Sequence, residues 1–334
     1  MKRFCVILLC FCFAATAFCF AACADDEKTT VRLNEVTHSV FYAPLYIAIN
    51  NGYFDETDIK IELTNGGGAD KVMTALVSGG ADIGLMGVEA CIYTKIQGIA
   101  NNPVVFGQLT KRDGSFLVSK KDEAATFKWT DLAGKNIIIG RQGGMPAMTM
   151  EYILNKYNLY DGVNCTMDKA TAFNNMGNVF YADSSVHYTT LFEPTASEFA
   201  AAGKGYIVAS VGSESGEVPY TAFTALSSYL TKNRDIAKKF LAAVYKGYIF
   251  MTENDSATVA HALAPSFDGT SLESLVYAVD SYLAIDAWSN TPVMTAAAFD
   301  KLQDIMINAG ELAAKTDFSA IVDNSIAREV VGLA

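Results

Sequence analysis

The sequence has few of the residues from which metal centres, disulfide frameworks and nucleophilic sites are built. Its 334 residues include three histidines, His38, His187 and His261, which lie far apart. No Cys/His cluster has metal-ligand spacing, and no G-x-S-x-G motif or Cys–His arrangement indicates a nucleophilic enzyme. Of the seven cysteines, only Cys91 and Cys165 lie beyond the first 23 residues. We therefore expect no metal site and two buried free thiols rather than a disulfide framework.

Basic residues are also in the minority. The 36 acidic and 25 basic residues give a formal net charge of −11 at pH 7. An acidic balance disfavours nucleic acid and anionic membrane surfaces as partners. Beyond the N-terminal segment, no apolar run approaches the ~20 residues that a membrane-spanning helix needs. We expect no nucleic-acid partner and no spanning helix in the body of the chain.

The longest apolar run lies at the N-terminus. Two basic residues precede an apolar stretch at 4–20, and two alanines then precede Cys23. This order predicts an export signal over residues 1–22. A cysteine after two small residues resembles the lipobox of bacterial lipoproteins, in which that cysteine becomes the acylated N-terminus; the alternative is an ordinary cleaved signal. We predict lipidation at Cys23, a tether over 23–30, and anchoring of the exported protein to the cell membrane, on its periplasmic or cell-surface side.

The body alternates strands and helices. Without residues 1–22 it still exceeds the ~250–300 residues at which single cores stop growing, so two lobes are expected. The first series has predicted strands at 31–36, 60–64, 82–86 and 104–109 and helices at 43–49, 70–77 and 89–97. The second series, after 115–119, has strands at 136–140, 164–167, 188–192 and 206–210 and helices at 148–157 and 194–202. Such alternation predicts an α/β fold with mainly parallel sheets.

Helical spacing dominates the last third of the chain. Helices are predicted at 235–252, 271–285 and 296–309, with Thr270 and Thr295 as N-caps. We expect the first lobe to comprise 31–114 plus 226–334 and the second lobe 120–219. The chain would cross between them near 115–119 and 220–225, and the helical tail would pack on the first lobe. A ligand cleft would then lie between the lobes, beyond the carboxyl ends of the strands.

Four motifs in order resemble a known superfamily. They are Phe41-Tyr-Ala-Pro-Leu-Tyr-Ile-Ala-Ile-Asn-Asn-Gly-Tyr-Phe, Ala75-Leu-Val-Ser-Gly-Gly-Ala-Asp-Ile-Gly-Leu-Met-Gly, Leu191-Phe-Glu-Pro and Val218-Pro-Tyr-Thr. The pattern, over about residues 31–310, is similar to solute-binding proteins of ABC importers for nitrate, sulfonates, taurine and thiamine pyrimidine precursors. The resemblance implies a two-lobed periplasmic-binding-protein fold of the two-crossing kind, a small-molecule solute, a membrane permease as partner, a monomer, and no cofactor.

Glycine-rich turns at strand ends are the first candidates for ligand contact. Arg141-Gln-Gly-Gly-Met-Pro follows a predicted strand and precedes a helix, so backbone N–H groups of Gly143, Gly144 and Met145 could bind an anion. The Arg141 side chain could add a bidentate contact. The alternative is a tight turn in which Arg141 meets solvent or pairs with an acid.

The first lobe offers comparable turns. The candidates there are Gly67, Gly68, Met86, Gly87 and Glu89. The glycines could present N–H groups or simply form strand-to-helix turns. Glu89 could cap a helix or accept hydrogen bonds from a ligand, and Glu193 in the second lobe has the same two interpretations. Two acids beside one arginine favour a heteroaromatic or amino-bearing ligand over a bare inorganic anion.

Further candidates lie in the first loop and near the crossings. Tyr42 could stack on a ring, and Ser39 could hydrogen-bond it. The crossing candidates are Gln108, Asp113, Ser115, Tyr220 and Thr221. These side chains could contact ligand or merely satisfy backbone groups.

The same superfamily contains an enzyme, the pyrimidine synthase of thiamine biosynthesis. Its substrate histidine precedes the Gly-Tyr-Phe glycine by ten residues, a count that leads here from Gly52 to Tyr42, while His38 would need a shifted loop. The enzyme's cysteine cluster has no counterpart at 211–220. Both departures, and the export signal, favour a binding protein. A surface lipoprotein without a transport role is a third possibility, which a filled-in cleft would support.

Overall fold

The computed structural model describes residues 28–333. The predicted signal at 1–22, Cys23 and most of the expected tether lie outside the described residues. The tether prediction was wrong at its end, because Thr29 and Thr30 already belong to the first strand. Within 28–333, no helix has both the length and the apolar character required to cross a bilayer.

The first sheet has the order β2-β1-β3-β10-β4. Its strands are β1 (Thr29–Glu35), β2 (Ile59–Asn65), β3 (Ile83–Met86), β4 (Pro103–Thr110) and β10 (Thr221–Leu226). β1 pairs in parallel with β2 and β3, whereas β10 runs antiparallel to both of its neighbours. The sheet is thus mainly parallel, as expected, and its antiparallel member comes from the returning chain.

Helices cover this sheet. They are η1 (Val40–Tyr42), α2 (Ala43–Asn50), η2 (Asp55–Thr57), α3 (Ala69–Val77), α4 (Glu89–Ile96), α9 (Ser227–Lys232) and α10 (Arg234–Glu253). Pro44 stands in the first turn of α2, where its missing N–H costs no helical hydrogen bond. α10 approaches α2 so closely that a Cβ on Gly247 would lie 2.1 Å from the carbonyl oxygen of Pro44.

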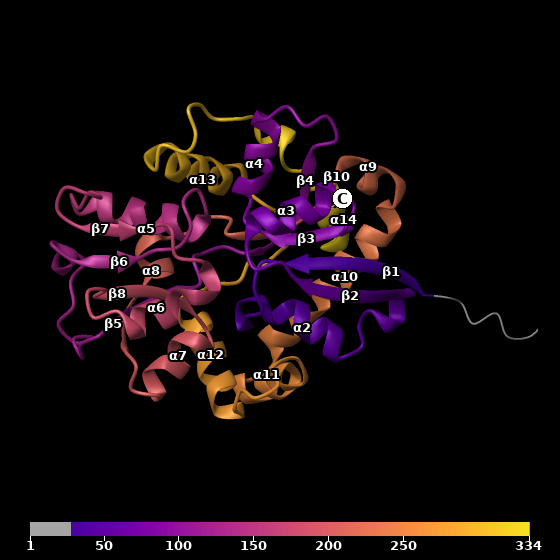
Figure 1. The fold of residues 1–334 in the computed structure, drawn as a ribbon. Coiled ribbons are helices and arrows are strands. Elements are labelled where there is room, and N and C mark those ends of the chain that lie inside the picture. The colour runs from indigo at the N-terminus through magenta and orange to yellow at the C-terminus, as the bar shows by residue number, and fades with distance from the viewer. Residues whose placement is uncertain (1–27, 334) are drawn as a thin grey trace, which may run out of the picture.

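The second sheet has the order β7-β6-β8-β5-β9. Figure 1 labels β7, β6, β8 and β5 of this sheet. Its strands are β5 (Ser115–Ser119), β6 (Asn136–Ile138), β7 (Thr166–Asp168), β8 (Tyr188–Phe192) and β9 (Tyr206–Ser210). Its helices are η3 (Trp129–Leu132), α5 (Met145–Lys156), η4 (Phe173–Asn175), α6 (Met176–Ala182), α7 (Thr195–Ala201) and α8 (Val211–Ser215). β6 is parallel to β7 and β8, and β5 is antiparallel to β8 and β9.

The chain changes sheet slightly earlier than expected. Residues 115–119 form β5 inside the second sheet, and 221–226 form β10 inside the first. The connecting segments are therefore 111–114 and 216–220, a correction to the expected crossings. They are tightly packed, because a Cβ on Gly114 would lie 2.6 Å from the Phe41 ring.

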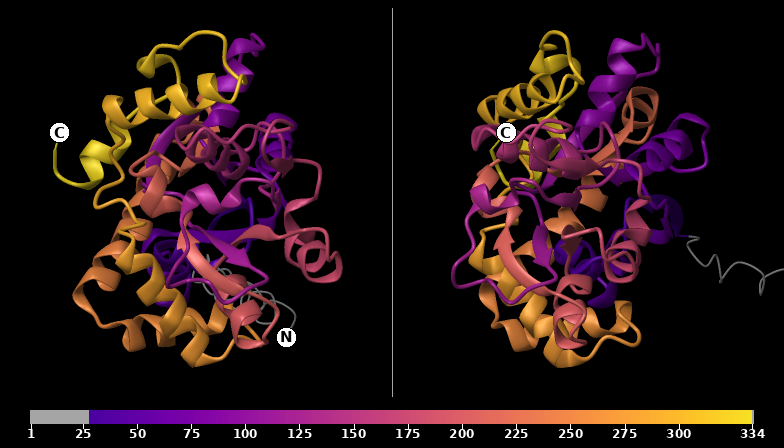
Figure 2. Two further views of the ribbon diagram at one scale, coloured as in Figure 1. Left: turned by 90° about the vertical axis from the view of Figure 1, so that its left-hand side faces the viewer. Right: turned by 60° about the vertical axis from the view of Figure 1, so that its left-hand side comes forward.

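The helical tail packs on both lobes, not on the first alone. It contains α11 (Ser256–Leu263), η5 (Ala264–Ser266), α12 (Leu272–Ala284), α13 (Ala296–Asn308), η6 (Phe318–Ala320) and α14 (Ser325–Val330). α14 packs on α10 and β4, but α12 contacts α7 and α13 contacts both α5 and α4 (Figures 1 and 2). Thr295 caps α13 as predicted. The Thr270 prediction was wrong, since Ser271 caps α12.

Apolar packing joins the two lobes. A smaller cluster fills the second lobe alone, around Leu117, Ile137 and Met150. The larger cluster extends from the first sheet to Phe116 and Met148 of the second lobe. Cys91 and Cys165 are buried and free, as predicted.

Candidate ligand-binding site

A cavity of about 260 Å³ lies between the two sheets. It is bordered by the segments that follow β1, β2 and β3 in the first lobe, by those that follow β6 and β7 in the second, and by Phe192 at the end of β8. Ten of the predicted site residues line it: Tyr42, Gly67, Gly68, Gly87, Glu89, Arg141, Gly144, Met145, Tyr220 and Thr221. The structure therefore brings together side chains that are up to about 180 residues apart in sequence, at the strand ends where open α/β sheets bind ligands.

Helix N-termini from both lobes border this cavity. α3 begins just after Gly68, α4 begins at Glu89, and α5 begins just after Gly144. Gly67 has φ +71° and Gly68 has φ +152°, a region that side chains with a Cβ rarely adopt. The first turns of these helices present N–H groups without intrahelical partners, which favours ligand atoms that carry negative charge.

Glu89 is the most unusual polar group in the cavity. Its side chain is buried, and Oε2 has no hydrogen-bond partner among the described residues. The carboxyl group folds over Gly87, where a Cβ would lie 2.0 Å from Oε2. Burial raises the pKa of Glu89 to about 7, while Arg141 acts to lower it. The carboxyl group can therefore accept or donate a hydrogen bond near neutral pH.

Arg141 pairs with an acid from the opposite lobe. Its Nε lies 3.4 Å from Oδ1 of Asp70, and its Nη1 donates to the carbonyl of Gln142 at 3.0 Å. Both paired side chains are about half exposed. They separate the cavity from a more open hollow of about 480 Å³ that shares Asp70, Glu89 and Arg141. The guanidinium group thus stands at the mouth of the cavity and is paired with an acid, which is the predicted alternative to direct ligand contact.

Four aromatic rings form much of the cavity wall: Tyr42, Phe173, Phe192 and Tyr220. Phe192 lies 5.6 Å from Phe173 and 6.2 Å from Tyr220 between ring centroids. Burial raises the pKa of both tyrosines, so their hydroxyls stay protonated. The buried Tyr220 hydroxyl has no geometrically aligned partner within the described residues.

Several lining residues were not predicted. They are Val36, Thr37, Ala69, Asp70, Lys71, Pro146, Ala170, Thr171, Ala172, Phe173 and Phe192. Residues 170–173 follow β7, so the strand-end argument used for the other turns would have found them. Phe192 directly precedes Glu193 within a motif already singled out. Ala170, Ala172, Phe173 and Phe192 have apolar side chains, which do not suggest a ligand contact in the sequence alone.

Five of the predicted residues have structural roles. Met86 packs into the core beside Gly84. The side chain of Gln108 donates to the carbonyl of Thr110 at 3.1 Å. Asp113 Oδ1 accepts from the backbone N–H and the hydroxyl of Ser115, at 2.7 and 2.6 Å.

The fifth, Gly143, faces the outer hollow rather than the cavity, and its carbonyl accepts from Tyr93 at 3.0 Å. For Gln108 and Ser115, the satisfaction of local polar groups is the alternative that the structure favours. Asp113 shares the bonds to Ser115, but its buried Oδ2 has no partner among the described residues. None of these five residues lines the cavity between the sheets.

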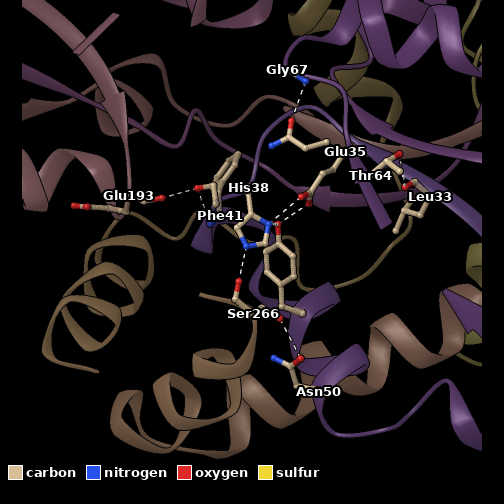
Figure 3. Close-up of polar contacts among 12 residues, drawn as sticks. Leu33, Glu35, His38, Phe41, Asn50, Thr64, Gly67, Glu193 and Ser266 are labelled. Carbon is tan, nitrogen blue, oxygen red and sulfur yellow. Dashed lines mark hydrogen bonds and ion pairs between the residues drawn. The ribbon is translucent and has the colours of Figure 1, made fainter. Parts of the chain in front are cut away.

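Ser39 and Glu193 contact each other between the lobes. The Ser39 hydroxyl donates to the Glu193 carbonyl at 2.6 Å and accepts from the Phe41 N–H at 3.2 Å (Figure 3). Tyr282 of α12 accepts from the Glu193 N–H at 2.9 Å. Ser39 and Glu193 line a neighbouring cavity and not the cavity between the sheets.

His38 is held in a separate polar network. Its Nδ1 lies 3.0 Å from Oε1 of Glu35, and its Nε2 lies 2.6 Å from the carbonyl of Ser266 (Figure 3). Tyr46 donates to the other oxygen of Glu35 at 2.5 Å. The bond to Glu35 raises the pKa of His38. Because both ring nitrogens are engaged, the imidazole has no free nitrogen to offer a substrate. Among the described side chains, no cluster of three His, Cys, Asp or Glu could hold a metal ion.

The amino-acid sequence is similar to those of known proteins. A family model described as NMT1/THI5 like matches residues 40–257. The chain is 41% identical over 310 residues, 92% of each chain, to a Bacillus subtilis (strain 168) protein named "Putative binding protein YtlA". It is 30% identical over 137 residues, 40% of this chain and 39% of the other, to 4-amino-5-hydroxymethyl-2-methylpyrimidine phosphate synthase of Aspergillus parasiticus.

Among solved structures, the alkanesulfonate-binding protein SsuA from Xanthomonas axonopodis pv. citri, bound to MOPS, matches with a TM-score of 0.71. The sequences are 17% identical, and the match covers 90% of this chain and 99% of that one. That likeness confirms the expected two-lobed α/β fold of the periplasmic binding proteins. The family match and the relative that spans 92% of the chain establish more than fold: the chain belongs to the NMT1/THI5-like family.

Proposed function

We propose that this protein is the extracytoplasmic substrate-binding lipoprotein of an ABC importer. It captures a small solute reversibly between its lobes, closes by hinge motion at 111–114 and 216–220, and presents the closed form to a membrane permease. The observation that carries the proposal is the 260 Å³ cavity, whose walls come from both sheets. The extensive similarity to a protein named as a binding protein supports it.

The cavity walls favour a flat, amino-bearing ligand. An engineered cavity of ~150 Å³ already holds benzene, so about 260 Å³ accommodates a substituted ring. Four aromatic side chains offer stacking surfaces, and the free oxygen of Glu89 calls for a hydrogen-bond donor. Arg141, the cation best suited to an anion, already faces Asp70. An aminopyrimidine suits these groups better than nitrate or a simple sulfonate does.

Two other functions are less well supported. The similarity to the pyrimidine synthase covers 40% of the chain, and both ring nitrogens of His38 are engaged. A surface lipoprotein without a transport role would not need an open cavity between its lobes. We therefore propose no catalytic activity, no cofactor, and a monomeric binder tethered at Cys23 beside its permease.

Thermal shift against a ligand panel tests the proposal. Residues 24–334 would be heated with nitrate, taurine, alkanesulfonates, thiamine and aminopyrimidines. A ligand at 100 times its dissociation constant stabilises the folded state by ~2.7 kcal/mol. We expect this stabilisation from an aminopyrimidine. Stabilisation by nitrate or sulfonates alone would overturn the ligand class, and no response to any compound would remove the support for solute capture.

A further inference from the structure

A second cavity continues from the first. It also encloses about 260 Å³ and shares Thr37, Phe173 and Phe192 with the main cavity. We call it the annex. Ser39 from the first lobe and Glu193 from the second lobe border it, so it lies in the same cleft between the lobes. Phe192 thus borders both spaces.

Two buried polar atoms of annex residues lack partners. Glu193 Oε1 and Thr190 Oγ1 have no hydrogen bond within the described part of the chain, although Glu193 is 1% and Thr190 3% exposed. The other oxygen of Glu193 accepts from the N–H and hydroxyl of Ser197, at 3.0 and 2.7 Å. The carboxylate is therefore fixed in place with one acceptor free. Buried acceptors without partners are costly in a folded protein, so these atoms point to a ligand group that completes them.

The annex lining contains a carboxyl group, Glu193, that has no ion-pair partner among the described residues of the same wall. Of residues 28–333, no lysine or arginine lines it, and its titratable residues are Glu193 and His38. The ring nitrogens of His38 are committed to Glu35, Tyr46 and Ser266, so the imidazole offers the annex no N–H. A carboxylate without a lysine or arginine in its cavity is best satisfied by a donor that carries positive charge.

We propose that the annex binds a protonated amine arm of a ligand whose flat ring occupies the main cavity. The arm would pass beside Phe173 and Phe192 and donate to Glu193 and Thr190. This inference rests on the proposed solute-binding function and deepens it, because it defines the solute as bipartite: an amino-bearing ring plus an amine arm. Among the described residues, Oε2 of Glu89 in the main cavity and Oε1 of Glu193 in the annex have no partner, so each cavity can offer the ligand one carboxylate acceptor.

Calorimetric titration of matched probes tests the annex. The probes are 4-aminopyrimidine, its 5-(3-aminopropyl) derivative and the 5-butyl derivative, which has the same shape without the charge. The aminopropyl compound should bind at least tenfold more tightly than the butyl compound. Glu193→Gln and Thr190→Val should each reduce this preference, and Glu193→Gln should abolish most of it. The affinity of each variant for 4-aminopyrimidine, which has no arm, is measured alongside, so that only the difference between the aminopropyl and butyl compounds tests the annex.

Glu273→Gln is the matched control, because Glu273 is exposed on α12 and lines neither cavity. Butylamine alone, followed by thermal shift, probes the annex without the ring. Stabilisation that Glu193→Gln removes and Glu273→Gln retains supports the annex even if no pyrimidine binds. Pyrimidine binding with no preference for the amine arm, and no butylamine effect, would overturn the annex and leave the proposed function intact. If none of these probes binds, the annex is overturned, and the wider ligand panel described above then decides whether solute capture itself stands.

Discussion

Arg141 and Asp70 face each other across the mouth of the cavity, with Nε 3.4 Å from Oδ1. Arg141 follows β6 in the second lobe, and Asp70 stands in the first turn of α3 in the first lobe. The pair links the lobes at the boundary between the main cavity and the outer hollow. An anionic ligand that used Arg141 would compete with Asp70 for it, whereas a neutral ring would not.

Because Asp70 and an anionic ligand compete for Arg141, substitutions at Asp70 and at Arg141 should change the sulfonate affinity in opposite directions. Asp70→Asn should strengthen binding of a sulfonate up to about fivefold, because an exposed ion pair is worth ~0.2–1 kcal/mol, and Arg141→Ala should weaken it at least tenfold. Neither should alter 4-aminopyrimidine binding much. Titration calorimetry measures the affinity of each variant for the sulfonate and for 4-aminopyrimidine, compared with wild type. Unchanged sulfonate affinity in Arg141→Ala would remove Arg141 from the site.

Glu89 should make stability depend on pH. Its pKa is raised from 4.5 to about 7 by burial, so the folded state holds this proton more tightly than the unfolded state does. Its contribution to stability is therefore fully present below pH ~4.5 and is lost as pH rises through 7. Relative to wild type, Glu89→Gln should gain up to about 3 kcal/mol between these limits. Urea unfolding at pH 4.5, 6 and 7.5 measures this, and parallel pH profiles would contradict it.

The packing at the first crossing should be intolerant of one methyl group. A Cβ on Gly212 would lie 2.1 Å from the carbonyl oxygen of Asp113, and backbone cannot rotate away as a side chain can. Gly212→Ala should therefore lower the free energy of unfolding by ~1–3 kcal/mol or more. Gly80→Ala, whose methyl would meet nothing closer than 3.4 Å, is the control. Equal denaturation midpoints for the two variants would show that the crossing can relax.

Cys23 should matter for location and not for binding. Cys23→Ser removes the thiol that lipidation requires, so the protein should leave the membrane fraction while its ligand affinity stays the same. Fractionation followed by calorimetry checks both parts. Retention in the membrane fraction would indicate an anchor other than acylated Cys23.

Local sequence patterns predict the strands and helices well, but they do not predict which of these elements pack against one another. The apolar run at 115–119 was assigned to a crossing, but it pairs with β8 and β9 inside the second sheet. A run of apolar residues does not indicate which sheet a strand joins. Likewise the helical spacing of α12 and α13 was evident, but their contacts with α7 and α5 were not, because those contacts depend on how the lobes are placed.

The sequence by itself determined the alternation of strands and helices, the glycine turns that open α3 and α5, and the family resemblance, since each depends on residues close together in the chain. Only the tertiary structure decided which turns share a cavity. Arg141 meets Asp70, Ser39 meets Glu193, and Glu89 keeps one oxygen free. These relationships join segments that are far apart in sequence, and their distances are set by the packing of one lobe against the other.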